Sequence, residues 1–547
     1  MIGRVLHALR TGAAKRTPGP LRRALFASGL VVVAAAPIVS FATSNPAGAA
    51  AYPTSHTLNL SFLQDPGQPP DPDVYYAGSG LLLTRNMYQG LLTYEADTPK
   101  RVLEPELATS WTVSANKLVY TFQLRHGVLF HDGTPFTSAA IAPDFARRTA
   151  VNGGPAYQVA DVASVQAPGP YTAVITLKAP NTAFLDYLAS PYGPAMESPT
   201  ALAANAGSDN DQTYLETHDI GTGPYTLTEA KVGVMYQMKA FPQYWGSKPY
   251  YTTINLPVID NLSTEEIEFN DGQLDAILNN LTTSAIAQYS RNSKVSVYNL
   301  PTLQAETAYV NENKGFLTTT KNRIDLLEAI DANALVAGVF PGRATVATQA
   351  GPKGLLPTQY GKQDIPYDPA KLKKLVASLP ASKRTFTIGY DTGASDDQLL
   401  AENIGAELGA DGLSTKVVGY QTSEIYAAVG SASTAAGPSQ PNMLIDYFWP
   451  DTYNTYTWTH ISFDPSGGLE YMSCNVPGEA ALDSQAVETG SNALYNQAVE
   501  KAVSSGCWFN IADKDDTMVT QPWLKGVPQA HIVADSWMLE LATLHPG

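Results

Sequence analysis

The hydrophobic and polar pattern of residues 385–463 predicts alternating strands and helices. The strand-like stretches are β-branched and aromatic runs, and the stretches between them have a helical period. This order predicts a parallel sheet with helices on its faces, and ligands of such sheets bind beyond the carboxyl ends of the strands. The expected strands are residues 385–390, 414–420 and 442–447, and the expected helices are residues 396–411 and 422–430.

An acid and several aromatic residues follow the third of these strands. Asp446 lies at its carboxyl end, and Tyr447, Trp449, Tyr453 and Trp458 come next. A carboxylate beside aromatic rings suits a cationic or hydrogen-bonding ligand with apolar side groups. We therefore predict that these residues bind the ligand. The alternatives are that the acid only caps the following loop and that the rings only pack beneath the pocket.

Two N-cap signals indicate where helices begin. Asp368 before Pro369 predicts an N-cap followed by Pro at the first helical position. Ser395 with Gln398 predicts a capping box for the helix at 396–411. Both signals place helices beside the predicted parallel sheet.

The first 51 residues differ from the rest of the chain. They contain six basic residues and no acid, then an apolar run at 24–42, then small residues up to Ala51. This order is typical of an export signal, and we expect cleavage near Ala50 or Ala51. An uncleaved anchor is the alternative, because about 18–20 apolar residues can span a bilayer. No Cys near this end could take a lipid, so we expect an exported protein, periplasmic or at the cell surface, without a lipid anchor.

Length and charge limit the architecture and the partners. Domains usually run to about 50–250 residues, so 547 residues predict two or three lobes. The chain has 50 acidic and 34 basic residues. Phosphate contacts need clustered Lys and Arg, and this balance therefore argues against nucleic acid as a partner.

The chain has two cysteines, Cys474 and Cys507. An exported protein meets oxidising conditions, so we predict a disulfide between them. It would close a loop of about 34 residues and stabilise the fold by about 3–4 kcal/mol. A metal pair is the alternative, but no His or third Cys lies close by in the sequence to complete a site. We therefore expect no metal site.

Familiar catalytic motifs are missing from the sequence. It contains no Gly-x-Ser-x-Gly elbow, no His-Glu-x-x-His and no phosphate-binding Gly-x-x-x-x-Gly-Lys loop. Glu265, Glu266 and Glu268 fit a charged helical start better than a pair of glycosidase carboxylates. His131 and Asp132 fit a turn better than part of a triad. We predict ligand binding without catalysis or cofactor, and a secreted hydrolase is the alternative from another functional class.

A set of motifs in a fixed order resembles the signature of a known family. The motifs are MYQGLLTY (87–94), LATSW (107–111), YTFQLRHGVLFHDGTPF (120–136), GTGPY (221–225), YW (244–245), DGQLD (271–275), AID (329–331) and YDP (367–369). This order resembles the extracytoplasmic solute-binding proteins of the oligopeptide, dipeptide and nickel type, family 5, which serve ABC importers. The resemblance spans residues 52–547.

The resemblance implies a two-lobed α/β fold of the type II periplasmic-binding-protein class. Two crossing strands would form a hinge, and the lobes would close on the ligand. The implied parts are a signal peptide at 1–51, lobe I at 52–303 with an inserted subdomain at about 84–219, lobe II at 304–516, and a return to lobe I at 517–547. A monomer that delivers its ligand to the membrane permease of an ABC importer is expected.

The resemblance also implies a role for one acid. In peptide-binding members, the Asp that matches Asp446 pairs with the α-ammonium of the ligand. Peptide is therefore the first expectation, and oligosaccharide is the nearest alternative because the Tyr and Trp residues could stack on sugar rings. Arg343 is a candidate for meeting a ligand carboxylate, with a surface position as the alternative. The sequence departs from the family after Asp446, where Tyr-Phe-Trp-Pro-Asp replaces a shorter turn.

Overall fold

The computed structural model describes most of the chain after the expected signal. The described residues are 55–421, 424–425, 440–464, 472, 474–535 and 537–547. The expected export signal at 1–51 lies outside them, as does most of the predicted helix at 422–430. Within the described residues, no helix is both long enough and apolar enough to cross a membrane.

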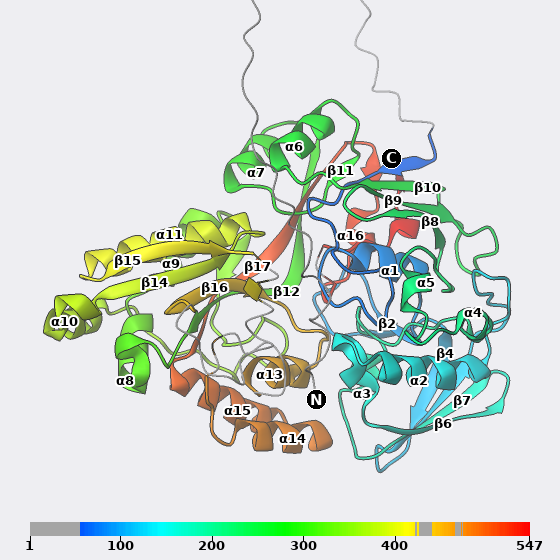
Figure 1. The fold of residues 1–547 in the computed structure, drawn as a ribbon, viewed down its shortest axis with the longest axis horizontal. Helices are drawn as coiled ribbons and strands as arrows, with labels where there is room; N and C mark the ends of the chain where they lie inside the picture. The colour runs from blue at the N-terminus through cyan, green and yellow to red at the C-terminus, as the bar shows by residue number, and fades with distance from the viewer. Residues whose placement is uncertain (1–54, 422–423, 426–439, 465–471, 473, 536) are drawn as a thin grey trace, which may run out of the picture. The chain divides into compact units, whose positions relative to one another are not determined.

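The predicted strand–helix alternation is present and is parallel, as expected. β14 (Thr385–Asp391) pairs in parallel with both β15 (Ser414–Tyr420) and β16 (Met443–Phe448). The helix between β14 and β15 is α11 (Ser395–Ala410), which packs on these two strands (Figure 1). Its buried residues include Leu400, Ile404 and Leu408, which are spaced by four and therefore share the face turned to the sheet.

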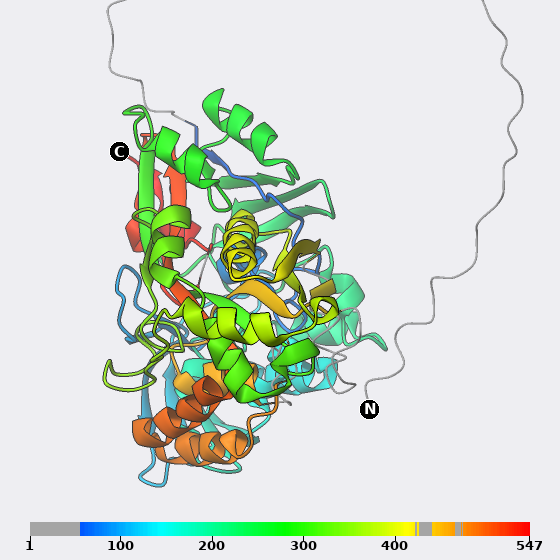
Figure 2. The ribbon, with the colours of Figure 1, turned by 90° about the vertical axis from the view of Figure 1, so that its left-hand side faces the viewer.

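Two long strands extend this sheet. β12 (Ser296–Val310) and β17 (Trp508–Thr520) run side by side and antiparallel (Figure 2). At one end β12 also pairs with β16, and at the other β17 pairs with β11 (Ala276–Ile277). The strand order is β11-β17-β12-β16-β14-β15, and β13 (Ala344–Val346) also pairs with β17.

The expected lobe boundaries fall inside these two long strands. The boundary after residue 303 lies in β12, beside a register shift between Leu300 and Gln304. The boundary after residue 516 lies in β17. Both parts of the chain therefore share one continuous sheet, and the division into lobes stays a prediction.

The other strands form smaller sheets. One has the order β1-β10-β9-β8 and another the order β4-β5-β7-β6, the second lying within the expected inserted subdomain. Two pairs, β2-β3 and β18-β19, complete the described sheets. Their bounds are β1 (Thr57–Asn59), β2 (Leu92–Tyr94), β3 (Leu103–Pro105), β4 (Ala108–Val113), β5 (Val119–Leu124), β6 (Val162–Gly169), β7 (Thr172–Leu177), β8 (Tyr225–Lys231), β9 (Met235–Ala240), β10 (Thr253–Pro257), β18 (Leu524–Lys525) and β19 (His545–Pro546).

The remaining α-helices connect these sheets. They are α1 (Leu81–Met87), α2 (Ile141–Val151), α3 (Phe184–Tyr187), α4 (Pro199–Asn205), α5 (Gln212–Leu215), α6 (Leu262–Asn270), α7 (Thr283–Tyr289), α8 (Thr320–Leu327), α9 (Ala332–Val339), α10 (Pro369–Ser378), α13 (Thr455–Phe463), α14 (Glu479–Thr489), α15 (Asn492–Ser505) and α16 (Val527–Ala530). The Asp368 cap of α10 is confirmed, because its carboxylate accepts a hydrogen bond from the Ala370 N–H at 3.3 Å. The Ser395 cap is wrong, because Ser395 is already helical and α11 begins one residue earlier than expected.

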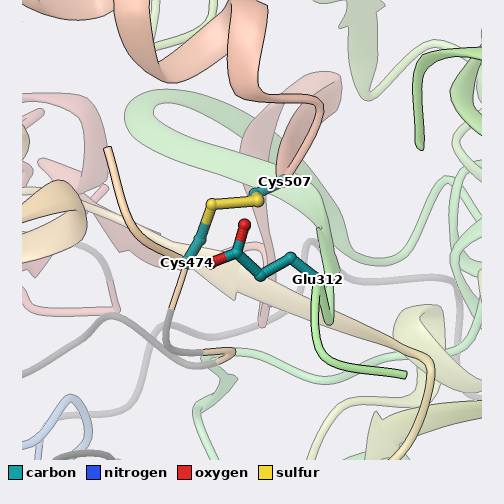
Figure 3. A group of neighbouring side chains, drawn as sticks. All are labelled: Glu312, Cys474 and Cys507. Carbon is teal, nitrogen blue, oxygen red and sulfur yellow. A yellow bond between two sulfur atoms is a disulfide. The ribbon is translucent and has the colours of Figure 1, made fainter. Parts of the chain in front are cut away.

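A disulfide joins the segment before α14 to the start of β17. Cys474 and Cys507 are bonded to each other, and their Cα atoms are 6.2 Å apart. The Glu312 side chain lies next to the bridge (Figure 3). Because both sulfurs are used in the bridge, neither is a free thiolate for a metal, which was the alternative interpretation of this pair.

Candidate ligand-binding site

A cavity of about 970 Å³ lies at the carboxyl ends of the three parallel strands. Gly393 follows β14, Gln421 follows β15, and Tyr447 to Trp449 end β16 and begin the next loop. Another part of the wall comes from the amino-terminal part of the chain, at residues 61–68, 74, 76–79 and 82. This volume is at the upper end of the range of small-molecule sites, and the position is the one expected for a ligand of a parallel sheet.

The cavity wall combines aromatic rings with acids. Among the described lining residues, none is Lys or Arg. The acids are Asp65, Asp260 and Asp451, and His460 also lines the wall. The aromatic lining residues are Phe62, Tyr76, Tyr157, Tyr192, Tyr447, Phe448, Trp449 and Trp537.

Three of the rings form one corner of the cavity. Tyr447 and Trp449 stack with their planes 5° apart and their centroids 5.4 Å apart. Trp537 packs edge-on against both, with centroids at 5.2 Å. Gly78 lies against this corner, since a Cβ there would come within 2.9 Å of both tryptophan rings. The corner is therefore a rigid apolar surface, suited to the flat or apolar part of a ligand.

Trp537 is held in an unusual backbone conformation. Its φ of 62° lies in the left-handed region, which a bulky residue rarely adopts. Its N–H donates a hydrogen bond of 2.8 Å to a carboxylate oxygen of Asp516. Strain of this kind persists where the surroundings enforce it, and here the Asp516 contact is one such constraint.

Asp516 should make the stability of the fold depend on pH. Burial raises its pKa to about 7, from an ordinary value near 4. A carboxyl whose pKa is raised by folding contributes stability that is present below its unfolded pKa and is lost as pH rises through about 7. Urea unfolding should therefore show a larger loss of stability between pH 5.5 and 8 in the native protein than in Asp516→Asn. Asn retains an acceptor for the Trp537 N–H, and equal losses in both proteins would contradict this assignment.

Asp451 ties the loop after β16 to the amino-terminal part of the chain. Its Oδ2 accepts hydrogen bonds from the Tyr76 hydroxyl at 2.6 Å and the Tyr157 hydroxyl at 2.7 Å. Its backbone carbonyl accepts a third from Ser190 Oγ at 2.7 Å. Burial raises the pKa of Asp451 to about 6, while the two phenol hydrogen bonds act in the opposite direction. The group is therefore oriented by two donors and is mostly ionised above neutral pH.

Comparison with known sequences identifies the family. The model of "Bacterial extracellular solute-binding proteins, family 5 Middle" matches residues 102–469, which is more than half of the chain. The chain belongs to this family. The resemblance of the ordered motifs is thereby confirmed.

The sequence of this solute-binding protein is similar to those of two named binding proteins. It is 27% identical to the probable D,D-dipeptide-binding periplasmic protein DdpA of Escherichia coli K12, over 64% of this chain and 67% of DdpA. It is 30% identical to the glutathione-binding protein GsiB of Escherichia coli O1:K1, over 54% of this chain and 56% of GsiB. The matches thus span about half to two thirds of these relatives.

The fold is shared with solved family structures. NikA of Brucella suis, crystallised with Fe(III)-EDTA, superposes with a TM-score of 0.76, covering 90% of this chain and 100% of NikA. The two sequences are 23% identical, so this likeness establishes the fold alone. The expected type II α/β class of the solute-binding protein is confirmed.

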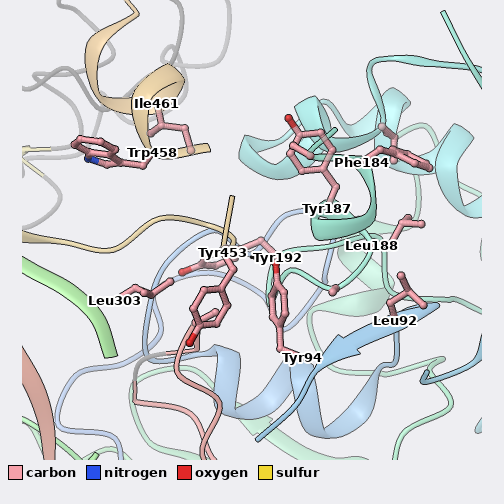
Figure 4. Packing of buried hydrophobic residues seen from close by; sticks show 14 of the residues in the cluster. Leu92, Tyr94, Phe184, Tyr187, Leu188, Tyr192, Leu303, Tyr453, Trp458 and Ile461 are labelled. Atoms are coloured by element: carbon pink, nitrogen blue, oxygen red, sulfur yellow. Dashed lines mark hydrogen bonds between the residues drawn. The ribbon is translucent and has the colours of Figure 1, made fainter. Parts of the chain in front are cut away.

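Two of the predicted ligand-binding residues line the cavity, and four do not. Tyr447 and Trp449 belong to the aromatic corner. Trp458, 1% exposed, packs edge-on against Phe463. Tyr453 packs edge-on against Tyr94 (Figure 4). Trp458 and Tyr453 lie in the hydrophobic core of the solute-binding protein and outside the described lining. Ligand contact by these rings stays a prediction.

Asp446 lies outside the described lining of the cavity. It is 4% exposed, and burial raises its pKa well above the ordinary value, with further contributions from the nearby acids Asp391 and Glu306. A carboxyl in such surroundings tends to keep its proton, and a neutral acid is a weak partner for an ammonium. Its role as the ammonium partner stays a prediction.

Arg343 is buried and already paired. Its guanidinium lies 3.3 Å from both carboxylate oxygens of Asp396 and donates to Thr283 Oγ1 at 2.8 Å. It lines a separate cavity of about 20 Å³, which shares Trp537 with the large one. A surface position is therefore wrong, and contact with a ligand carboxylate stays a prediction.

A second group of acids has the spacing of a metal site but holds a guanidinium. Asp71, Asp73 and Glu197 bring carboxylate oxygens within 4.8 Å of one another. Arg147 lies among them and donates to all three, at 2.6 to 2.9 Å. The positive charge that these acids require is thus supplied by the protein.

Several cavity residues were not expected from the sequence. Tyr76, Tyr157 and Trp537 come from parts of the chain far from the predicted sheet. Asp451 lies within the aromatic loop, five residues after Asp446, and the extra length of this loop relative to the family pattern was the available signal. A longer loop carries its acid further from the strand end, to where the amino-terminal phenols bind it.

Proposed function

We propose that the protein binds a short peptide in the 970 Å³ cavity and delivers it to the membrane permease of an ABC importer. The proposal places the mature protein outside the cytoplasmic membrane as a monomer. Its support is membership of family 5, together with relatives named for D,D-dipeptide and glutathione. Binding alone accounts for the site, so no catalytic step is included.

The observation that carries the proposal is the composition of the cavity wall. It offers rings for apolar side chains and acids for positively charged or N–H groups. Its wall combines the strand ends of the parallel sheet with residues from the amino-terminal part of the chain. A ligand that touches both parts of the wall favours the conformation in which they are close, and so favours closure by differential contacts.

Peptide binding is tested by identifying the ligand that the purified protein retains and by measuring which added peptides it binds. Native mass spectrometry of the protein purified without refolding should show a bound peptide, and calorimetry should detect binding of di- and tripeptides. Trp449→Ala should weaken peptide binding about tenfold, because it removes half of the stacked pair in the corner and about 1–2 kcal/mol of contact. Tyr367→Ala is the matched control, since Tyr367 is 53% exposed and outside the described lining.

An oligosaccharide is the second candidate, favoured by the stacked rings of Tyr447 and Trp449. Sugar rings bind to flat aromatic faces of this kind. Retention of a saccharide mass, with no uptake of any peptide, would replace the peptide proposal by this one. Release of cleaved products from either ligand would instead support a hydrolase.

A further inference from the structure

The charges around the cavity are of one sign. Asp65, Asp260 and Asp451 line it, and among the described lining residues no Lys or Arg opposes them. Burial lowers the pKa of His460, which favours its neutral form, while the nearby Asp464 acts in the opposite direction. The wall therefore presents net negative charge to whatever enters.

The basic side chains of the adjoining small cavity are already paired. In the adjoining small cavity, Lys514 lies 2.9 Å from a carboxylate oxygen of Glu306 and 2.9 Å from one of Asp396. Arg343 pairs with the same Asp396. A carboxylate brought into the large cavity would lose part of its hydration without gaining a free cation from the described lining, which disfavours its binding.

The three lining acids differ in what already binds them. Asp65 accepts hydrogen bonds from the Gly67 N–H at 2.8 Å, from the Gly233 N–H and from the Tyr236 hydroxyl at 3.1 Å, so both its oxygens are already hydrogen-bonded within the protein. Asp260 is exposed. Asp451 is 4% exposed, and both of its phenol donors bind Oδ2.

This arrangement favours Asp451 as the group that meets a ligand. Two donors on one oxygen fix the plane of the carboxylate, and Oδ1 remains as its second acceptor. A buried carboxylate that is oriented in advance binds a cation without losing side-chain freedom. The aromatic rings of the cavity also favour a positively charged ligand group, because aromatic faces attract cations.

We propose that Asp451, oriented by Tyr76 and Tyr157, binds a positively charged group of the ligand, and that the cavity selects peptides without a free carboxylate. This inference rests on the proposed function, because it names the class of peptide that the same cavity takes. The charged group is an ammonium, supplied either by the peptide amino terminus or by a lysine side chain. The preferred ligand carries net positive charge.

Four peptides of equal length test the inference by calorimetry at pH 7.5. They are Ala-Phe-Ala with a free acid, Ala-Phe-Ala amide, acetyl-Ala-Phe-Ala amide and acetyl-Ala-Phe-Lys amide. The free-terminus amide should bind at least tenfold more tightly than the free acid and than the neutral acetylated amide. Binding of the acetylated lysine peptide at the level of the free-terminus amide would show that the site takes a lysine ammonium as well as an amino terminus; binding at the level of the neutral peptide would restrict the site to the amino terminus.

Substitution of Asp451 assigns the effect to one residue. Asp451→Asn keeps an acceptor for the two phenols and removes the charge, so it should abolish the tenfold preference for the cationic amide over the neutral peptide. Should this variant fail to fold, Tyr76→Phe and Tyr157→Phe each remove one orienting donor and should reduce the preference severalfold. Asp446→Asn is the comparison, and it should leave the preference in place.

The outcomes separate the two proposals. Binding of the free acid as tightly as the amide, or an unchanged preference in Asp451→Asn, would overturn the inference while peptide binding stands. Loss of the preference in Asp446→Asn alone would move the ammonium to Asp446, and would also overturn it. Failure of all four peptides to bind would remove the proposed function and the inference with it.

Discussion

Arg147→Ala should lower the free energy of unfolding by about 3–5 kcal/mol, because it removes the cation that Asp71 and Glu197 bind and leaves Asp73 with Arg148 alone. The Arg147 side chain is 5% exposed, and its partners Asp71, Asp73 and Glu197 are buried almost completely. The substitution removes four hydrogen bonds to the acids, a fifth to the Asn210 carbonyl and the charge together. Urea unfolding at pH 7.5 gives the difference.

An ion pair with an exposed lysine is the matched control for Arg147. The side chain of Lys321 is 77% exposed and bonds Asp325, which is 7% exposed, four residues along α8. Removal of the Lys321 side chain should change stability by less than about 1 kcal/mol, since water screens the exposed ammonium. Equal effects of Arg147→Ala and Lys321→Ala would show that the buried cluster keeps its acids protonated and does not depend on the guanidinium.

The double variant Cys474→Ala, Cys507→Ala should lose about 3–4 kcal/mol of stability. The bridge spans a sequence separation of 33 and restricts that loop in the unfolded chain, so its loss adds freedom mainly to the unfolded state. The midpoint of urea unfolding should fall accordingly. Treatment with dithiothreitol before unfolding should lower the native protein to the level of the variant and leave the variant unchanged. A variant that matches the oxidised native protein would contradict this account.

Local pattern was enough to predict the sheet at the site. The β-branched and aromatic runs at β14, β15 and β16 and the helical period at α11 predicted the order of these elements, and the parallel pairing followed from that order. The position of a site at the strand ends followed from topology alone. Tyr447 and Trp449 could be predicted as lining residues because they lie directly at that edge of the sheet.

Residues brought together across long separations could not be predicted in this way. The hydrogen bonds of Asp451 join it to Tyr76 and Tyr157 over separations of 375 and 294 residues. The acids around Asp446 likewise converge from β12 and β14. Neither periodicity nor composition predicts contacts between residues so far apart in the sequence. The partners of a buried acid, and therefore the direction of its pKa shift, could not be predicted before the fold was known.

The sequence did not show which aromatic residues line the cavity and which pack in the core. Trp458 lies on α13, a helix whose residues are buried on nearly every side. Such a helix belongs to a core, and its rings carry no signature that separates packing from ligand contact. The Ser395 cap failed for a similarly local reason, since a one-residue change in where the helix starts moves the cap to Ala394.

The continuity of β12 and β17 limits how the protein can be divided or tagged. A fragment cut at residue 303 or 516 would break a strand in mid-sheet and expose backbone N–H and C=O groups that pair in the whole chain. Reporter domains for a biosensor are better inserted at the turn around Gly233, where Val232 and Val234 are exposed and the β8–β9 hairpin closes.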